Sequence, residues 1–273
     1  MTAGCTLAYH STFRTKNKDK APDGVSITTF FYAPAECFSG RSVRLTEDEA
    51  HHVFRVLRIR EGSEIEVVDG IGGWYRVELT RSDGAAVEGI VRERRLGVGE
   101  LLFDLQLGVG LIRSRSRLEA AIEKAVELGV RCVTLLDCDN SGSGSTDVER
   151  IRRVARAAMK QSLRSRLPDI KGPVPFKEFL DTARGSPGFI CEADEEADER
   201  FASVAAAVND MTSGEECLVL VGPEGGFSPE EVDLAEQTGF RRVSLGKRRL
   251  RTETAAIVVC SAVMLAADRS SER

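Results

Sequence analysis

The sequence has few of the residues that mark metalloproteins or disulfide-bonded proteins. It contains three histidines and one tryptophan, and its seven cysteines are scattered without a CxxC pair. Few imidazoles give a metal site little support, and an odd number of scattered cysteines argues against a disulfide framework. We therefore expect no metal, free thiols and a reduced, cytoplasmic setting.

Long apolar runs are also absent. The longest one, from Ala255 to Ala267, spans 13 residues, which is too short to cross a bilayer and is typical of a buried helix. No secretory signal is visible, and residues 1–28 are polar and mildly basic, which predicts a disordered extension. A transit peptide in this segment would place the protein in an organelle, but its two aspartates argue against one.

The net charge gives no global basic field for nucleic acid, because it is −5. The charges are nevertheless unevenly placed. Residues 147–171 carry eight Lys/Arg against three Asp/Glu, residues 241–251 carry six Lys/Arg and no acid, and residues 189–237 carry fourteen acids against one Arg. Local basic patches can bind phosphate while an acidic flank offsets the total. Solvated helix faces would give the same pattern, so charge alone leaves both interpretations open.

Residues 29–98 alternate short apolar segments with glycine turns. This texture predicts strands over residues 64–68, 74–80 and 85–92 in a small barrel or curled sheet. The run Thr46-Glu47-Asp48-Glu49 has the form of a capping box and predicts a helix from there to about Arg58.

From about residue 101 the pattern changes to alternating strands and helices. Such βα units predict a mostly parallel sheet with helices on both faces, which binds ligands at the carboxyl ends of its strands. The expected strands are 101–109, 130–136, 189–191, 217–221 and 241–245, and the expected helices are 117–128, 148–163, 229–237 and 254–267.

A glycine-rich loop, residues 222–227, follows one of these strands. Ser228, Pro229 and Glu231 then open a helix as its N-cap, first residue and third residue. The loop is neither a dinucleotide-binding GxGxxG nor a P-loop, and the acidic Glu224 disfavours a phosphate cradle. A cationic or neutral ligand fits better, although a purely structural turn is an equal alternative.

A second loop, residues 245–252, also lies between a strand and a helix. Loops that follow parallel strands lie at the same end of the sheet, so the two loops could frame one pocket. Arg251 in this loop and Glu253 just after it are charged residues near the helix start, where they could serve chemistry or merely form an ion pair.

Both loops carry long motifs that resemble a known family. LVGPEGGFSPEEVDLAEQTGF at residues 220–240 and VSLGKRRLRTETA at residues 243–255 are similar to the C-terminal signature of the RsmE-type 16S ribosomal RNA (uridine-N3)-methyltransferases of the SPOUT superfamily. Residues 123–130 resemble the family's KATELGV element, residues 49–58 its EAHHLLRVLR element, and residues 161–168 its EQSGRxxxP element. The resemblance covers about residues 30–268 in the family's order.

The resemblance implies an α/β fold with two domains. A small PUA-like β-barrel that binds RNA would occupy residues 29–98, and a trefoil-knotted SPOUT methyltransferase domain would occupy residues 99–273. The implied protein is a homodimer that uses S-adenosylmethionine as methyl donor. Its implied substrate is 16S ribosomal RNA, within the 30S subunit, and no membrane is involved.

The resemblance also implies roles for individual residues. Arg251 and Glu253 would be catalytic. The residues implied to bind the cofactor are Gly222, Pro223, Glu224, Gly225, Leu245, Gly246, Leu250 and Thr254. The residues expected to contact RNA are Arg55, Arg58, Arg153, Arg156, Arg164 and Arg166.

Two segments depart from the family pattern. Lys160-Gln161-Ser162-Leu163 stands where the family usually has Glu-Gln-Ser-Gly, and residues 137–141 stand where it often has an arginine-containing segment. Methylation of another RNA position, such as a ribose hydroxyl, therefore remains an alternative. A non-catalytic RNA-binding protein of ribosome assembly is a second alternative, and a nucleotide-binding oxidoreductase is disfavoured by the missing GxGxxG.

The composition of residues 1–28 gives a first prediction. This segment has little apolar surface to bury, so it should lie outside the folded core. Deletion of residues 1–28 is expected to leave the melting temperature and the methyltransferase activity in vitro nearly unchanged. A large fall in melting temperature, measured by calorimetry, would contradict the prediction.

Overall fold

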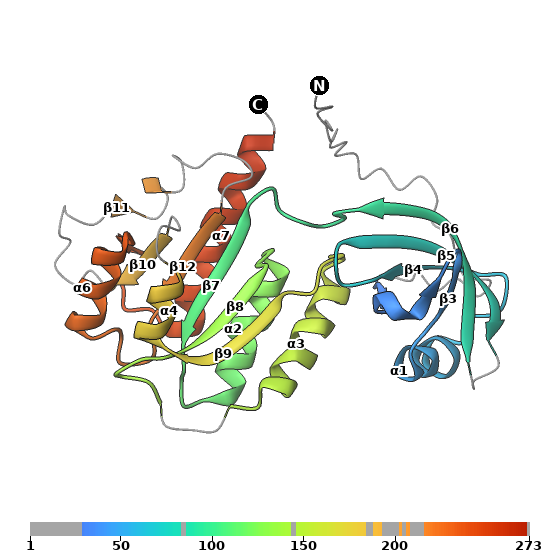
Figure 1. Cartoon of the computed structure of the whole chain (residues 1–273), viewed down its shortest axis with the longest axis horizontal. Coiled ribbons are helices and arrows are strands. Elements are labelled where there is room, and N and C mark those ends of the chain that lie inside the picture. Colours follow the sequence, from blue (N-terminus) through green and yellow to red (C-terminus); the bar gives the residue numbers. More distant parts are fainter. Residues whose placement is uncertain are drawn as a thin grey trace.

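The computed structural model contains two sheets, each with its own helices, which form the two lobes seen in Figure 1. The predicted extension over residues 1–28 lies outside the described part of the chain. The structure describes residues 29–82, 86–142, 146–183, 188–192, 202–203, 206–207 and 216–271.

The first lobe is built on a six-stranded sheet in the order β1-β4-β5-β6-β3-β2. Only the β1–β4 pair is parallel, and side chains such as Phe31, Ile65 and Leu79 are fully buried within this lobe. The three predicted strands are confirmed, whereas β1 to β3 are too short to give a sequence pattern. The strands are β1 (Phe31–Tyr32), β2 (Phe38–Ser39), β3 (Ser42–Arg44), β4 (Glu64–Val68), β5 (Gly73–Ser82) and β6 (Val87–Leu96), with a 3-10 turn η1 (Ala35–Cys37).

The predicted helix of this lobe is confirmed, but its predicted capping box is wrong. Helix α1 (Glu47–His51) runs directly into a π-helical turn, η2 (His52–Val56). The Thr46 side chain makes no capping hydrogen bond. Glu49, which the capping box would turn back to the helix start, is buried and pairs with Lys160 of the other lobe. A long-range ion pair has therefore replaced the local cap.

The second lobe confirms the predicted parallel sheet. Its strands follow the order β11-β13-β10-β12-β7-β8-β9, and every neighbouring pair is parallel. Parallel sheets are covered by helices on both faces, which explains the continuous apolar runs of their strands. The strands are β7 (Asp104–Gly110), β8 (Cys132–Asp137), β9 (Asp169–Pro175), β10 (Gly188–Glu192), β11 (Ala202–Ser203), β12 (Glu216–Val221) and β13 (Arg241–Ser244).

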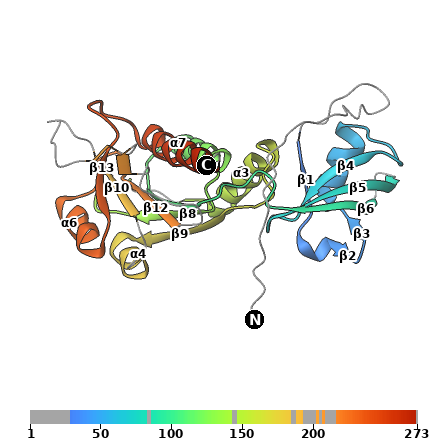
Figure 2. The same ribbon diagram turned by 90° about the horizontal axis from the view of Figure 1, so that it is seen from above.

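Helices cover both faces of this sheet, as Figure 2 shows. Alternate residues of β12 point to opposite layers: Val219 packs in the cluster with α2, α3 and α7, and Leu220 packs in the cluster with α4 and α6. Within the described residues, no helix has the length and apolar character that would let it cross a membrane. The helices are α2 (Arg115–Glu127), α3 (Val148–Gln161), α4 (Phe176–Thr182), α6 (Pro229–Thr238) and α7 (Thr252–Ser271).

Helix α6 begins and ends as its sequence predicts. The Ser228 hydroxyl accepts a hydrogen bond from the Glu231 backbone N–H, and the Glu231 carboxylate accepts one from the Ser228 N–H at 2.8 Å, which completes a capping box. Pro229 occupies the first turn, and Gly239 closes the helix with a positive φ of 109°. These signals fix where the glycine-rich loop before α6 must end.

Arg164 links the last turn of α3 to the segment that contacts the first lobe. Its guanidinium donates to the carbonyls of Val126 and Val130 and to the Glu100 carboxylate at 2.7 Å, and the side chain is only 2% exposed. The next residue, Ser165, accepts a hydrogen bond from Gly72 of the first lobe. The buried Arg164 guanidinium thus fixes the segment after α3, which contacts the first lobe.

This network yields a stability prediction. Arg164→Met would remove a buried cation and leave the Glu100 carboxylate without its charged partner, which costs about 3–5 kcal/mol of unfolding free energy. Urea unfolding should show the loss. Arg153→Met makes the same change on an exposed face of α3, and it should stay within about 0.5 kcal/mol of the unaltered chain. Equal effects of the two substitutions would contradict the assigned role of Arg164.

Candidate active site

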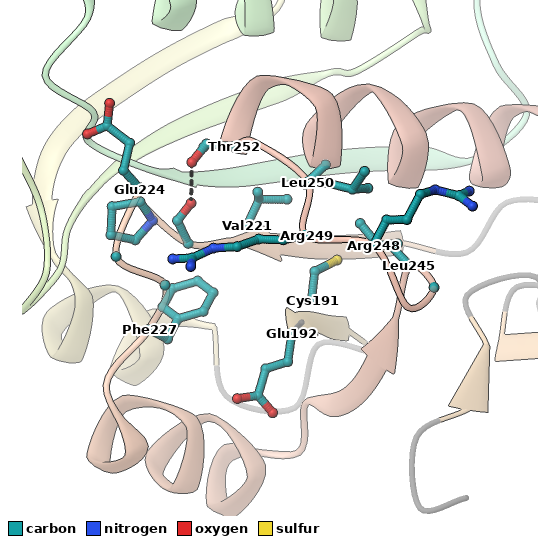
Figure 3. Close-up of a pocket in the computed structure, with 16 residues that line it drawn as sticks. Cys191, Glu192, Val221, Glu224, Phe227, Leu245, Arg248, Arg249, Leu250 and Thr252 are labelled. Carbon is teal, nitrogen blue, oxygen red and sulfur yellow. Dashed lines mark hydrogen bonds between the residues drawn. The ribbon is translucent and has the colours of Figure 1, made fainter. Parts of the chain in front are cut away.

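A cavity of about 300 Å³ lies at the carboxyl edge of the parallel sheet. Its walls come from the ends of three neighbouring strands, β10, β12 and β13, and from the start of α7 (Figure 3). Both loops singled out in the sequence line this one cavity. The arrangement follows from the parallel sheet, because its βα loops gather at one edge.

The first loop, residues 222–227, is kept tight by its own backbone. The Gly226 N–H donates to the Pro223 carbonyl at 2.9 Å, and Gly226 has a positive φ of 74° that favours glycine. Gly225 lies so close to Asn140 that an added Cβ would come within 2.9 Å of the Asn140 Cβ. The Asn140 side chain also donates to the Gly226 carbonyl at 3.2 Å. The loop after β8 therefore braces the glycine-rich loop from outside the cavity.

The second loop is tied to the first by Thr252. The buried Thr252 hydroxyl, at the start of α7, donates to the Gly222 carbonyl at 3.0 Å, as the dashed line in Figure 3 shows. At the other end of this loop, Gly246 has a positive φ of 105° and donates its N–H to the Ser244 hydroxyl. Thr252 was not among the predicted site residues. The only sequence signal for it is its place at the start of the last helix.

The cavity contains most of the residues predicted to bind a cofactor. Thr254 is the exception, since it is exposed on α7 and does not line the cavity. The predicted residues that do line it are Gly222, Pro223, Glu224, Gly225, Leu245, Gly246 and Leu250. The lining residues that were not predicted are Cys191, Glu192, Val221, Gly226, Phe227, Arg248, Arg249, Thr252 and Ala255.

Three of these additional residues are charged: Glu192, Arg248 and Arg249. Figure 3 shows the Arg249 side chain extending across the cavity toward Phe227, whereas the Arg248 side chain points away. Burial raises the pKa of the Glu192 carboxyl, and Arg242, at 3.6 Å from that carboxylate, acts in the opposite direction. The Glu192 carboxylate in the cavity wall thus lies beside the Arg242 guanidinium, which is outside the wall.

The cysteine in the wall is not a nucleophile. Burial raises the pKa of the Cys191 thiol to about 12, so the thiol stays protonated at neutral pH. Only a thiolate attacks efficiently, and such thiolates need a depressed pKa. The Cys191 thiol therefore adds a small, uncharged patch to the cavity wall.

Comparison with known proteins identifies the family. The sequence model of an RNA methyltransferase domain matches residues 100–264, and that of an RNA methyltransferase PUA domain matches residues 45–91. The chain belongs to this RNA methyltransferase family. The family accounts for both lobes, because each of the two matched segments falls within one of them.

Relatives of the methyltransferase cover most of the chain. A protein from Mycobacterium bovis named ribosomal RNA small subunit methyltransferase E is 30% identical over 87% of this chain and 91% of the relative. A protein of the same name from Bacillus subtilis is 29% identical over 80% and 88%. A probable rRNA-methyltransferase from Porphyromonas gingivalis has a similar structure, with a TM-score of 0.78 and 32% identity over 88% of this chain and 99% of that one.

A fourth relative is described as a complex. The structure of a ribosomal RNA small subunit methyltransferase E from Neisseria gonorrhoeae bound to S-adenosylmethionine has a TM-score of 0.76 and 26% identity. It covers 87% of this chain and 97% of that chain.

The two residues predicted to be catalytic in the methyltransferase lie at the start of α7 but do not pair with each other. Arg251 is exposed and forms no ion pair with the residues that the structure describes. Glu253 is half-buried, and its nearest cation is Arg117 of α2, at 3.9 Å. The alternative of an Arg251–Glu253 ion pair at the helix start is therefore wrong, because Arg117 takes that place beside the carboxylate.

Four of the arginines predicted to contact RNA lie on the surface. Arg55 and Arg58 are exposed beside Phe54 and Arg60, around an open depression of the PUA-like lobe. Arg153 and Arg156 are exposed on α3. The Arg156 guanidinium stacks over the ring of Tyr32, 5.0 Å from its centre. Because Tyr32 belongs to the first lobe, the basic face of α3 extends as far as that lobe.

The other two arginines have different surroundings. Arg164 is buried and its guanidinium is used by carbonyls and Glu100, so the expectation that it contacts RNA is wrong. Arg166 is half-buried at the junction of the lobes, where its backbone bridges to Gly70 and Ile71. The sequence could not separate these two from their neighbours, because a charged residue in a basic helix end is usually solvated.

Proposed function

We propose that the chain transfers a methyl group from S-adenosylmethionine to N3 of a uridine in small-subunit ribosomal RNA. The observation that carries this proposal is the single cavity between residues 222–227 and 245–252, the two loops that hold the longest family motifs. The Mycobacterium bovis and Bacillus subtilis relatives, both named ribosomal RNA small subunit methyltransferase E, support the substrate. The described complex of the Neisseria gonorrhoeae relative supports the donor.

The residues of the cavity suit this donor. Val221, Leu245 and Leu250 offer apolar walls for a flat base, and the glycine-rich turns offer backbone groups at close range. The volume of about 300 Å³ lies at the lower end of the range for small-molecule sites. A side chain at Gly222 would meet the backbone of residues 226–227 at 3.0–3.2 Å, so glycine is needed where the loop folds back on itself.

The chemistry assigns roles to the chain's own residues. Bound S-adenosylmethionine would supply an electrophilic methyl group. Uridine N3 carries a proton and attacks poorly until that proton is lost, so the site must orient the base and favour its anion. Arg251 is exposed directly after the cavity residue Leu250, and its guanidinium would stabilise negative charge on the base. It stays protonated at neutral pH and is no proton acceptor. Glu253, held beside Arg117, would face the same reacting atoms.

The two lobes would divide the work on RNA. The proposed domains are a PUA-like domain over residues 29–98 and a methyltransferase domain over residues 99–273. Arg55, Arg58, Arg153 and Arg156 would contact phosphates of the 30S subunit, since exposed arginines neutralise the RNA backbone. N3 lies on the pairing edge of uracil, so the target uridine must be unpaired or flipped out.

A trefoil knot and a homodimer remain part of the proposal. The direct bond between Thr252 and Gly222 supports loops that pass close to each other, as a knot requires. Leu265 of α7 is 52% exposed, which supports a partner subunit that covers this helix. A cytoplasmic location is supported by the buried free thiols among the described cysteines.

The identity of the product tests the proposal. Purified 30S subunits from a strain that lacks the protein, incubated with it and S-adenosylmethionine, should gain 3-methyluridine in 16S RNA. Nucleoside mass spectrometry with fragment mapping would locate it. A ribose-methylated product would refute N3 as the acceptor. RNA binding without any methyl transfer would instead favour a non-catalytic role in ribosome assembly.

Arg251 gives a sharper prediction about the chemistry. Arg251→Ala should lower turnover on 30S subunits about 100- to 1,000-fold, the usual cost of one electrostatic donor in a transition state. Arg251→Lys keeps the charge but loses the planar fork, so it should restore only part of the rate. Both variants should keep donor affinity and melting temperature.

The control is Arg131→Ala, which removes an exposed arginine that pairs with Asp104 at the opposite edge of the sheet. It should leave turnover unchanged. Near-normal turnover of Arg251→Ala would rule out a catalytic role. Parallel losses of turnover, donor affinity and melting temperature would show that Arg251 only anchors α7.

A further inference from the structure

Arg117, on the first turn of α2, lies beside two carboxylates: Glu224 of the glycine-rich loop, which lines the cavity, and Glu253 on the first turn of α7, which does not. Its guanidinium donates to Glu224 Oε1 of the first loop at 2.6 Å, and it lies 3.9 Å from Glu253 Oε2 at the start of α7. Neither the resemblance nor the sequence pattern assigned a role to this residue. Arg117 therefore links the glycine-rich loop to the start of α7 from a position outside both loops.

The surroundings of the two carboxylates make Arg117 hard to replace. Glu253 Oε2 is buried and has no hydrogen-bond partner among the described residues, so the nearby Arg117 is the cation that offsets its charge. Among the residues that the structure describes, the backbone N–H of Arg113, at 3.2 Å, is the one donor to Glu224 Oε2. A buried or half-buried carboxylate without a cation is costly, and two of them side by side would repel each other.

Arg117 does not belong to the wall of the donor cavity itself. It lines a neighbouring, more open depression with Arg113, Asn140 and Glu224, on the far side of the glycine-rich loop. Any influence of Arg117 on a molecule in the donor cavity must therefore pass through Glu224, which lines the cavity, or through the position of α7, which carries Glu253 next to the lining residue Thr252. Thr252 ties the same two loops from the inner side, by its bond to Gly222.

We propose that Arg117 is a positioning residue for methyl transfer, which holds the glycine-rich loop and the start of α7 in the spacing that fits the donor. The inference rests on the proposed function, because it concerns the same cavity. One arginine suits this place since its planar fork can meet two carboxylates at once, whereas a lysine is a single point charge.

The test compares Arg117→Met and Arg117→Lys with Arg131→Met in the full-length protein. Arg131 is the matched control, because it is also a partly exposed arginine with one carboxylate partner, Asp104, at 3.2 Å. Calorimetry with S-adenosylmethionine should show about tenfold weaker binding for Arg117→Met. A loss of this size corresponds to the combined free energy of two partly exposed ion pairs. Arg117→Lys should lose about threefold, since it keeps the charge for one partner. Arg131→Met should bind normally.

Kinetics and a double variant separate positioning from simple anchoring. Arg117→Met should raise the KM for S-adenosylmethionine more than it lowers kcat, with a melting temperature close to that of Arg131→Met. Glu224→Gln should weaken binding less in the Arg117→Met background than in the unaltered chain, because the two residues act through one contact.

Three results would overturn the inference. They are unchanged donor affinity in Arg117→Met, additive losses in the double variant, and a fall in melting temperature without any loss of affinity. If the unaltered chain itself binds no S-adenosylmethionine, the proposed function fails and the inference fails with it. Normal binding by the unaltered chain and by Arg117→Met alike would overturn the inference alone.

Discussion

The parallel register of β10, β12 and β13 is the constraint on which the candidate site depends. Cys191 of β10 lies opposite Val221 of β12 on one side and opposite Val243 of β13 on the other. The two loops therefore leave the sheet at nearly the same height, although about twenty residues separate them in the sequence. Their closeness follows from hydrogen bonding in the sheet. Thr252 then holds the second loop beside the first, through its hydrogen bond to the Gly222 carbonyl.

The junction between the lobes depends on a different kind of interaction. Trp74 and Val68 of the first sheet belong to the same apolar cluster as the helices of the second, so the two lobes share a core. Arg164 and Glu100 supply the charged centre beside it, and the Glu49–Lys160 pair joins α1 to α3. Exposed Arg156 stacks on Tyr32 near this junction. The arginines proposed to contact RNA in both lobes are thus set on one connected framework, which would let them bind a single RNA surface.

Local signals explain which parts of the fold the sequence could predict. The α6 capping box and the Gly239 stop depend on residues next to one another, and both are observed as expected. The same pattern at residues 46–49 failed, because Lys160, more than a hundred residues away, offers Glu49 a stronger partner than its own helix start. Strand β9 was missed since it is an edge strand with prolines and only alternate burial, and α4 has seven residues.

The same distinction applies to the candidate site. Sequence motifs located the two loops, since strand, glycine turn and helix follow in order. They could not reveal Arg117, whose partners are fixed only by packing of α2 against the sheet edge, or Thr252, whose hydroxyl matters because Gly222 happens to be within reach. Arg164 shows the converse error. It lies in a basic run with exposed neighbours, and only the fold shows that it points inward.

Acids and arginines are paired around the cavity, and this pairing suits the proposed reaction between a cationic donor and an anionic RNA. The two carboxylates that line the cavity have arginine partners, since Glu224 lies beside Arg117 and Glu192 lies beside Arg242. Glu253, on the adjoining first turn of α7, also lies beside Arg117. Unpaired acids at this edge would repel RNA phosphates. With the acids offset, the exposed guanidinium of Arg251 would be free to face the RNA in the proposed reaction. The acidic total of the chain is therefore compatible with an RNA substrate, because the sign of the charge at the cavity mouth is set by which residues remain unpaired there.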